Sequence, residues 1–240
     1  MVFSGGYKAR RFNWLIGVAL LLLTLLLDFT GYVLRWDQDT IWAFVVGTNL
    51  IRSVPGIGPG LYRFLVAGEA IAAPALLRFY TWHVLGLAGV AAALITWHIF
   101  RVRRDGGISR RMTTPRVKRA QLIRTEVTAM LLALAGLLAL SLAVDAPLGP
   151  PGDPTGLAAA PRAPWFFLWV QELLRIGMPF VAGVMVPLLV LLIIVALPYA
   201  LDRSDAGMAV WFNRPGRLAQ IVFVFVVVVL LILTLRGATR

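Results

Sequence analysis

Five long apolar stretches dominate the pattern of the chain, and polar residues gather between them. Each stretch has about the 20 apolar residues that a helix needs to cross a bilayer. They run Asn13–Leu34, Arg78–Phe100, Thr125–Val144, Pro179–Leu201 and Leu218–Leu235. Because a helix satisfies its own backbone hydrogen bonds in lipid, the pattern predicts an all-α integral membrane protein with about five transmembrane helices.

Two long segments lie between these stretches, and the first of them is too interrupted to span a membrane and too apolar to lie free in water. The first separates the first two spans and is broken by turn-forming residues, Pro55, Gly56, Gly58, Pro59 and Gly60. The second is a linker rich in Pro and Gly, Pro147–Pro164, followed by the aromatic stretch Trp165–Leu174. Aromatic residues suit the membrane interface, so we expect both segments to lie along the surface, the second with a short helix.

Composition and charge agree with a lipid environment. Of the 240 residues, 60% are hydrophobic and only 14% are charged, and the mean hydropathy is +0.83. The net charge of +12 does not indicate a nucleic-acid partner, because the basic residues form a few short clusters between apolar runs. Fifteen of the 23 Lys and Arg residues lie in the N-terminal segment, in residues 101–124 and in residues 202–217. The positive-inside rule then places the N-terminus in the cytoplasm, and the C-terminus and both surface segments on the positive side. No cleavage site follows the first apolar run, so we expect an anchor and not a removable signal peptide.

The candidate chemistry rests on two histidines, His83 and His98, both in the second span. With no cysteine, the chain itself holds no disulfide, thiolate metal site, iron–sulfur cluster or thioether-linked haem. Fifteen residues of helix separate the histidines by about 22 Å and rotate them by only about 60° beyond whole turns. They therefore share a face, one near each membrane surface. The spacing fits polar residues that bond to neighbouring helices as well as it fits axial ligands of two stacked haems. Two haems would need two more ligands, which must come from another polypeptide.

Five motifs in order resemble cytochrome b of the Rieske/cytochrome b type of quinol-oxidising complex. Ser4–Trp14 is similar to the loop before the family's third helix, and Thr30–Gln38 to the end of that helix. Thr48–Gly58 is similar to the following surface helix, and Leu77–His83 to the start of the fourth helix. Ala163–Phe167 lies where the family has its Pro-Glu-Trp-Tyr quinol-site motif. The fourteen residues between the histidines match the plastid and cyanobacterial type, and the resemblance covers nearly the whole chain.

This resemblance implies the third helix onward of a split cytochrome b, a bundle that a partner chain with the N-terminal helices and the opposite haem ligands would complete. Residues 1–124 would form a haem-binding half and residues 125–240 a quinone-site half resembling subunit IV. His83 would bind the b-type haem nearer the positive side, and His98 the one nearer the cytoplasm. Gly31 would let a porphyrin approach the backbone, although a glycine also serves helix packing.

The resemblance also implies surroundings for the haems. Arg78 matches a family arginine and would reach a haem propionate, or its side chain would extend to the membrane interface. Arg101, with its neighbours Arg103 and Arg104, would neutralise propionates or bind anionic lipid. Two further departures from the family are Asp28 and Arg35. Asp28 places a carboxylate inside the first span, as a proton relay or an ion-pair partner, and Arg35 replaces the proline expected before a tryptophan.

Two quinone sites follow from the resemblance. The wall on the positive side would comprise Trp42, Ala43, Thr48, Pro164, Trp165 and Phe166. Pro164 replaces the family's proton-accepting glutamate, and Glu172, two helical turns after Trp165, is the candidate substitute; a solvated surface charge is the alternative. Glu126 opens the third span where the family has an acid beside the quinone-reducing site. It would deliver protons there, or it would simply stabilise a helix N-terminus.

The function that the resemblance implies is electron transfer from quinol, with proton translocation, in a complex in a prokaryotic plasma membrane. A Rieske-type iron–sulfur protein and a cytochrome c or similar acceptor would be partners; the family is dimeric, and the sequence leaves the oligomeric state open. A second hypothesis is a cytochrome b-like anchor that links a peripheral dehydrogenase or reductase to quinone. A third is a proton-coupled transporter without haem, which would use the histidines and Asp28 as a proton path.

Overall fold

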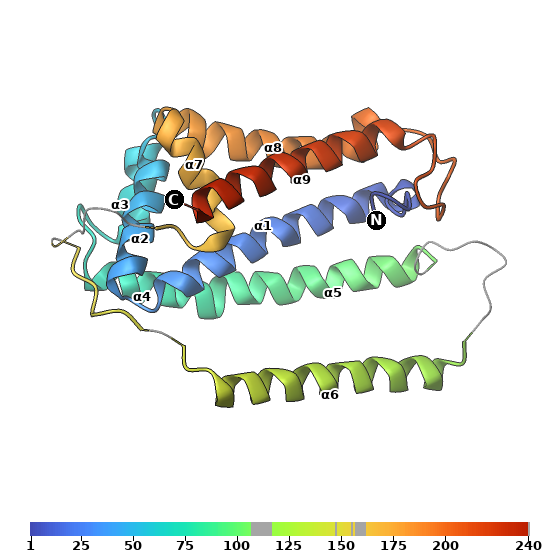
Figure 1. The fold of residues 1–240 in the computed structure, drawn as a ribbon, viewed down its shortest axis with the longest axis horizontal. Coiled ribbons are helices and arrows are strands. Elements are labelled where there is room, and N and C mark those ends of the chain that lie inside the picture. The colour runs from blue at the N-terminus through green and yellow to red at the C-terminus, as the bar shows by residue number, and fades with distance from the viewer. Residues whose placement is uncertain (107–116, 147, 155, 157–161, 240) are drawn as a thin grey trace. The chain divides into compact units, whose positions relative to one another are not determined.

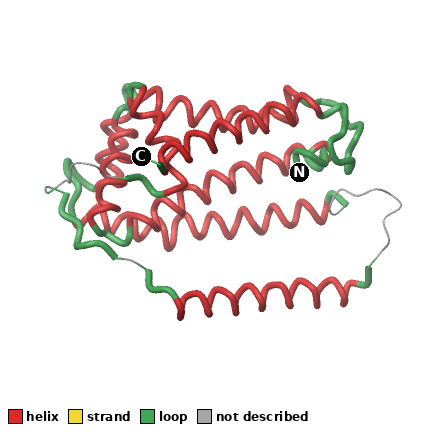
Figure 2. The backbone as a smooth tube through the Cα atoms, in the orientation of Figure 1, coloured by secondary structure: helices red, strands yellow, loops and turns green. Residues whose placement is uncertain are grey.

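The computed structural model describes residues 1–106, 117–146, 148–154, 156 and 162–239. The chain divides into two compact units, Met1–Ser109 with Gly149–Arg240, and Arg110–Leu148. The described residues are helical and contain no strand, only an isolated bridge between Asp37 and Pro151 (Figure 2). The all-α prediction is therefore confirmed.

Five helical spans are long and apolar enough to cross a membrane, which confirms the expected number. Four belong to the first unit, where they run lengthwise (Figure 1). They comprise η1 (Lys8–Arg10) with α1 (Arg11–Val33); α4 (Ala73–Thr81), η2 (Trp82–Leu87) and α5 (Ala88–Arg104); η4 (Val181–Met185), α8 (Val186–Ala196) and η5 (Leu197–Leu201); and α9 (Arg217–Ala238). The fifth span, α6 (Arg119–Ala143), belongs to the second unit. Several spans are longer than the predicted apolar stretches, because the helix continues into terminal turns that contain charged residues.

Shorter helices lie at one end of the first unit. Between the first two spans are α2 (Gln38–Arg52) and α3 (Gly58–Val66), and after the linker come η3 (Trp165–Phe167) and α7 (Leu168–Ile176). Figure 1 shows α2 and α3 across the ends of the long helices. Buried residues of four elements form the core there, Val33, Phe44, Tyr62, Val66, Ala75 and Phe79. The interrupted segment therefore forms two helices around a Pro-Gly turn, and the short helix expected after the linker is confirmed.

Backbone and side-chain hydrogen bonds connect the residues at the end of α1 to the linker that precedes η3. Trp36 has a positive φ of 52°, a left-handed backbone that reverses the chain, and its carbonyl accepts a hydrogen bond from the Gly152 N–H at 2.9 Å. A Cβ on Gly152 would lie 2.3 Å from Ile41 Cγ1, so only glycine fits there. The Asp37 carboxylate caps α2 through the Thr40 N–H at 3.0 Å. The linker residue Gly149 also donates its N–H to that carboxylate, at 3.3 Å.

Arg35, the residue without a role in the sequence analysis, forms an ion pair with the buried Asp37 carboxylate. Burial by itself raises the pKa of Asp37, but hydrogen bonds from Arg35, Thr40 and Gly149 and the Arg35 charge lower it below its ordinary value of 3.8. The Arg35 guanidinium also lies 5.4 Å from the centroid of the Tyr32 ring. Arg35 therefore stabilises the charged cap that joins α1, α2 and the linker.

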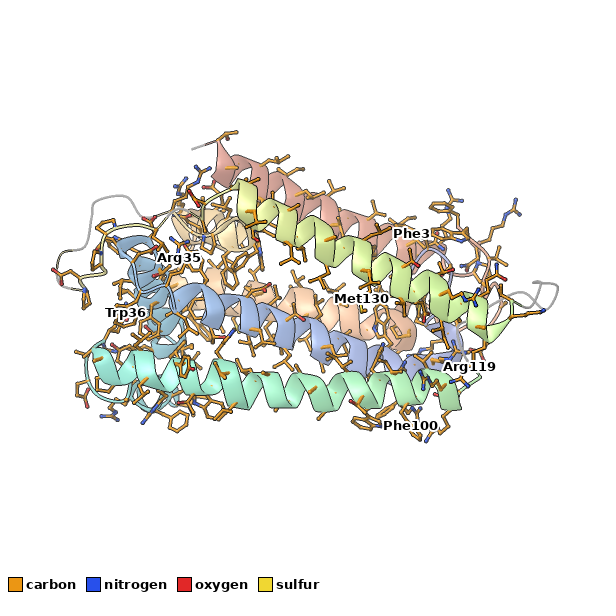
Figure 3. All side chains as sticks on the ribbon, turned by 90° about the horizontal axis from the view of Figure 1, so that it is seen from below. Phe3, Arg35, Trp36, Phe100, Arg119 and Met130 are labelled. Atoms are coloured by element: carbon orange, nitrogen blue, oxygen red, sulfur yellow. The ribbon has the colours of Figure 1, made fainter. Side chains whose placement is uncertain are left out.

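The opposite end of the first unit has its own contacts, and Figure 3 shows Phe3 and Phe100 there, far from Arg35 and Trp36. Val2 of the N-terminal segment packs with Leu197 and Ala219 of the third and fourth spans of this unit. Trp14 donates its indole N–H to the Ile194 carbonyl at 2.9 Å. These contacts hold the start of α1 against α8 and α9.

The helix of the second unit, α6, buries none of its residues within that unit. It begins at Arg119, two turns before the apolar stretch, and has no acidic residue in its first turn. Glu126 therefore lies in the helix body, and the alternative that it stabilises the helix N-terminus was wrong. The reason is that residues 119–124, which include Arg119, Gln121 and Arg124, continue the helix on the N-terminal side. Three of the basic residues counted for orientation, Arg110, Arg111 and Arg116, lie outside the described residues.

Candidate functional site

His83 lies in η2, the π-helical turn between α4 and α5, and its half-buried imidazole contacts α1. A Cβ on Gly31 would lie 2.9 Å from His83 Cε1 and 3.4 Å from Nε2. The neighbouring Thr30 places its hydroxyl oxygen 2.9 Å from His83 Nδ1. A π-helical turn widens the helix locally and is common at functional sites. The His83 imidazole therefore packs against the α1 backbone at Gly31, which has no side chain.

His98 repeats this arrangement near the other end of the same span. Its Cε1 would lie 3.5 Å from a Cβ on Gly17, and His98 is half-buried like His83. Its Nδ1 is buried and has no hydrogen-bond partner in the part of the chain that the structure describes. Both histidines therefore face α1, and the prediction that they share a face of their helix is confirmed.

Gly17 and Thr30 are residues that the sequence analysis missed. A signal for Gly17 was present, because Gly17 and Gly31 are 14 residues apart, about 21 Å along a helix. That spacing matches the separation of the two histidines. No local signal marks Thr30, whose contact with His83 spans 53 positions of sequence.

This donor set fits haem. Two imidazoles, each opposite a glycine, lie about 22 Å apart along one span, and imidazole nitrogen is a common axial ligand of haem iron. The glycines keep α1 backbone accessible at both positions, and any larger residue at Gly31 would displace His83. Each iron would still need a second ligand from outside these 240 residues, since the sequence contains no third histidine.

The two arginines assigned to the haem surroundings make local contacts. Arg78 donates a hydrogen bond to the Phe64 carbonyl and lies with its guanidinium 5.3 Å from that ring's centroid. It lines an open hollow of about 530 Å³ between α3 and α4. Arg101 forms an ion pair with Asp105 at 3.2 Å and lies 5.0 Å from the Phe12 ring centroid. Both stand at the ends of the span that carries the histidines.

The α2 residues of the expected quinone wall differ in exposure. Thr48 is buried and donates its hydroxyl proton to the Phe44 carbonyl at 2.7 Å. Trp42 and Ala43 are half-buried. The Trp42 indole N–H is itself buried, and no acceptor for it lies among the described residues. A buried donor of this kind is available to a ligand carbonyl.

The aromatic segment after Pro164 reaches the same end of α1. The Phe166 ring meets Tyr32 edge-to-face, with centroids 6.3 Å apart, whereas Trp165 is 75% exposed. Phe29 joins this segment to α2, since its ring packs against Phe167 with centroids 5.8 Å apart and lies where a Cβ on Gly47 would be. Phe29 therefore lies between α2 and the aromatic segment, and it precedes Thr30 and Gly31 in α1.

Glu172 is buried at the contact of α7 with α9 and is 3% exposed. Its carboxylate lies 2.5 Å from the Arg175 guanidinium and 3.7 Å from that of Arg236. The helices approach closely, because a Cβ on Gly237 would lie 3.3 Å from Glu172 Cγ. The sequence reading of Glu172 as a solvated surface charge was wrong, because α9 covers this face of α7. Asp28 is exposed on α1, three residues before Gly31, and makes no ion pair within the described ranges.

Two family models match the chain. The model described as "Cytochrome b(N-terminal)/b6/petB" matches residues 1–150, and "Cytochrome b(C-terminal)/b6/petD" matches residues 153–240. The chain belongs to the cytochrome b family. The resemblance found in the sequence motifs is thereby confirmed, and the chain is an integral membrane protein.

Curated relatives agree with the cytochrome b assignment. The menaquinol:cytochrome c reductase cytochrome b subunit of Geobacillus thermodenitrificans is 38% identical over 107 residues, which are 43% of this chain and 47% of the relative. Cytochrome b6 of Heliomicrobium gestii is 37% identical over 105 residues, 43% of this chain and 49% of the relative. Cytochrome b of Rhodobacter capsulatus is 39% identical over 106 residues, 44% of this chain and 24% of the relative. The matches thus span about half or less of the length of these relatives.

The likeness of fold to a solved structure extends over nearly the whole chain. A chain of a structure titled "Hyperthermophilic respiratory Complex III" superposes with a TM-score of 0.73 at 22% identity. The superposition covers 99% of this chain and 65% of that chain. At this identity the likeness concerns the fold alone.

Proposed function

We propose that the chain is the haem-binding, quinone-interacting, electron-transferring subunit of a membrane quinol:electron-acceptor oxidoreductase. The observation that carries the proposal is the pairing of each histidine with a glycine of α1, at two levels of one membrane span, in a member of the cytochrome b family. This observation favours the proposal over a haem-free transporter. An anchor without haems would likewise have no need of two such pairs.

His83 and His98 would each supply one axial ligand to a b-type haem. When bound, the two haems supply one-electron carriers between the two membrane faces. The chain's own residues hold and orient the imidazoles: Gly31 and Gly17 leave room beside them, and Thr30 contacts His83. Arg78 and Arg101 stand at the two ends of the same span, where a guanidinium would neutralise propionate groups.

Quinol would be oxidised at the end where α2 and residues 164–167 meet around Phe29. Aromatic and apolar side chains with few polar groups are typical of quinone-sized ligand sites. The buried Trp42 indole N–H is a donor for a quinone oxygen. Glu172 is the proposed proton acceptor there, although it would have to leave Arg175 to take a proton. Glu126 of α6 remains the proposed proton donor at a second quinone site.

The expected organisation remains part of the proposal. Residues 1–124 would form the haem-binding half and residues 125–240 the quinone-site half, in a bundle completed by another polypeptide with the opposite haem ligands. A Rieske-type iron–sulfur protein would take one electron from quinol. The N-terminus would face the cytoplasm of a prokaryotic cell, because most of the basic residues lie on that side.

The haem content of the complex tests this proposal. We would purify the complex with its partners in mild detergent, and measure b-type haem per copy together with the reduced-minus-oxidised spectrum. We expect two haems in the wild type, and loss of one haem in each of His83→Leu and His98→Leu. Matched controls are Thr81→Val and Thr96→Val. Each threonine is exposed, lies two residues before a histidine and, within the described residues, donates its hydroxyl proton only to a carbonyl of its own span.

A wild-type complex without b-type haem would overturn the proposal, even if both histidine variants failed to assemble. Retention of two haems by the double histidine variant would overturn the assignment of the ligands. Loss of haem in the Thr81 or Thr96 control would show that the readout reports assembly and not ligation.

A further inference from the structure

The contact between Thr30 and His83 is the starting point. Thr30 is 7% exposed and lies directly before Gly31 on α1. Its hydroxyl oxygen is 2.9 Å from His83 Nδ1, 2.8 Å from the Leu26 carbonyl and 3.2 Å from the Leu27 carbonyl. All three distances are within hydrogen-bonding range.

The arrangement of protons follows from these neighbours. A threonine hydroxyl has one proton to donate and lone pairs that accept. The carbonyls of Leu26 and Leu27 can only accept, so when His83 Nδ1 carries the ring proton the hydroxyl accepts the Nδ1–H and donates its own proton to one of these carbonyls. A neutral imidazole with its proton on Nδ1 has a lone pair on Nε2. The contact with Thr30 thus suits the tautomer in which Nε2 is free to bind a metal.

His98 has no equivalent contact. Its Nδ1 is buried without a hydrogen-bond partner in the described part of the chain, and the residue before Gly17 is Ile16, which has no polar side chain. The two imidazoles share the same span and the same kind of glycine neighbour. They differ in one respect: within the described residues, the Nδ1 atom of His83 has a hydrogen-bond partner and the Nδ1 atom of His98 has none.

We infer that Thr30 is a positioning residue that fixes the orientation and tautomer of His83 and, by accepting its Nδ1–H, lowers the midpoint potential of the haem bound there. This inference rests on the proposed function. A hydrogen bond from the second ring nitrogen makes a ligating imidazole more basic. A more basic ligand stabilises ferric over ferrous iron, and such hydrogen bonding is one means by which proteins set haem potentials.

Redox titration of both haems in the assembled complex tests the inference. Thr30→Val keeps the branched shape and removes the hydroxyl. We expect this variant to shift the ferric-to-ferrous ratio of one haem toward ferrous, about fivefold at a fixed ambient potential, as one hydrogen bond of about 1 kcal/mol implies. The second haem should be unchanged. The low-spin electron paramagnetic resonance signal of the affected ferric haem should also move, because the imidazole ring is free to rotate.

Two further variants separate positioning from packing. Thr30→Ser retains the hydroxyl and should restore both the potential and the resonance signal. Thr24→Val removes an exposed hydroxyl of α1 that bonds only the Leu20 carbonyl, and should leave both haems unchanged. If Thr30→Val releases the haem, its retention by Thr30→Ser supports the inference, and its loss from both variants counts against it.

Two bound haems with unchanged potentials and signals in Thr30→Val would overturn the inference and leave the proposed function standing. Absence of b-type haem from the wild-type complex would overturn the proposed function itself. The two failures are therefore distinguishable.

Discussion

Lys8 and Asp202 form an ion pair in which Lys8 Nζ lies 2.8 Å from Asp202 Oδ2, and the two side chains are 0% and 1% exposed. Tyr7 donates its hydroxyl proton to the same carboxylate at 2.6 Å, and Lys8 also donates to the Ala206 carbonyl at 2.8 Å. Burial, together with the hydrogen bond and the charge of Asp202, raises the pKa of Tyr7. These contacts join the segment before α1 to the segment after α8.

Removal of the Asp202 carboxylate should strongly destabilise the protein. Asp202→Ala leaves the Lys8 ammonium buried without its counter-ion, which typically costs about 3–5 kcal/mol. Thermal unfolding of the detergent-purified complex measures the effect. The matched control is Asp205→Ala, whose 81% exposed carboxylate pairs with Arg11 at the surface and should cost at most about 1 kcal/mol. Equal losses in the two variants would contradict the prediction.

The Asp37 cap should make stability depend on acidic pH. The folded pKa of Asp37 is lowered, so the charged carboxylate stabilises the fold fully above its unfolded value of 3.8. That stabilisation should be lost as the pH falls below 3.8 through the folded pKa. Melting temperatures of the wild type and of Asp37→Asn should differ by a constant amount at neutral pH and converge below about pH 4.

The control for this titration is Asp39→Asn, which alters an exposed carboxylate of α2 and leaves the Arg35–Asp37 pair in place. Its melting temperature should follow that of the wild type at every pH. A gap between the wild type and Asp37→Asn that stayed unchanged down to pH 2 would show that the Asp37 charge does not act through this cap.

The two α1 glycines should respond differently to the same substitution. In Gly31→Ala the new methyl group would lie 2.9 Å from His83 Cε1, too close for a normal contact, so the imidazole must move. In Gly17→Ala the distance to His98 Cε1 would be 3.5 Å, an ordinary van der Waals contact. We expect Gly31→Ala to lose or perturb one haem in the reduced-minus-oxidised spectrum, and Gly17→Ala to keep both. The opposite order would show that these contacts do not govern haem binding.

Glu172→Gln tests the proposed proton acceptor. The amide keeps the shape of the side chain at the α7–α9 contact and removes its basic oxygen. We expect haem content to be retained and quinol-driven haem reduction to slow by about 100-fold or more, the usual contribution of a positioned proton acceptor. Glu69→Gln changes an 82% exposed carboxylate and should leave the rate unchanged. A normal rate in Glu172→Gln, or loss of the assembled complex, would assign Glu172 to holding α7 against α9.

The local pattern of the sequence was sufficient for the spans, the short helix after the linker and the common face of the two histidines. Each depends on neighbours within a few turns, where the length of an apolar run or a 3.6-residue period decides the outcome. The same locality explains the error at Glu126. A hydropathy boundary marks where lipid contact begins, and the helix of α6 starts two turns earlier, at Arg119.

Only the tertiary structure decided which residues meet. Thr30 with His83, Glu172 with Arg236, and Lys8 with Asp202 are pairs between distant segments. The ordered motifs of the sequence identified the family, and with it the expectation that His83 and His98 face haems. The sequence could not place Thr30 beside His83, because that contact depends on the axial register and rotation of two packed helices. Side-chain packing along the whole interface determines this register and rotation. Neither quantity produces a periodic pattern of residues in the sequence.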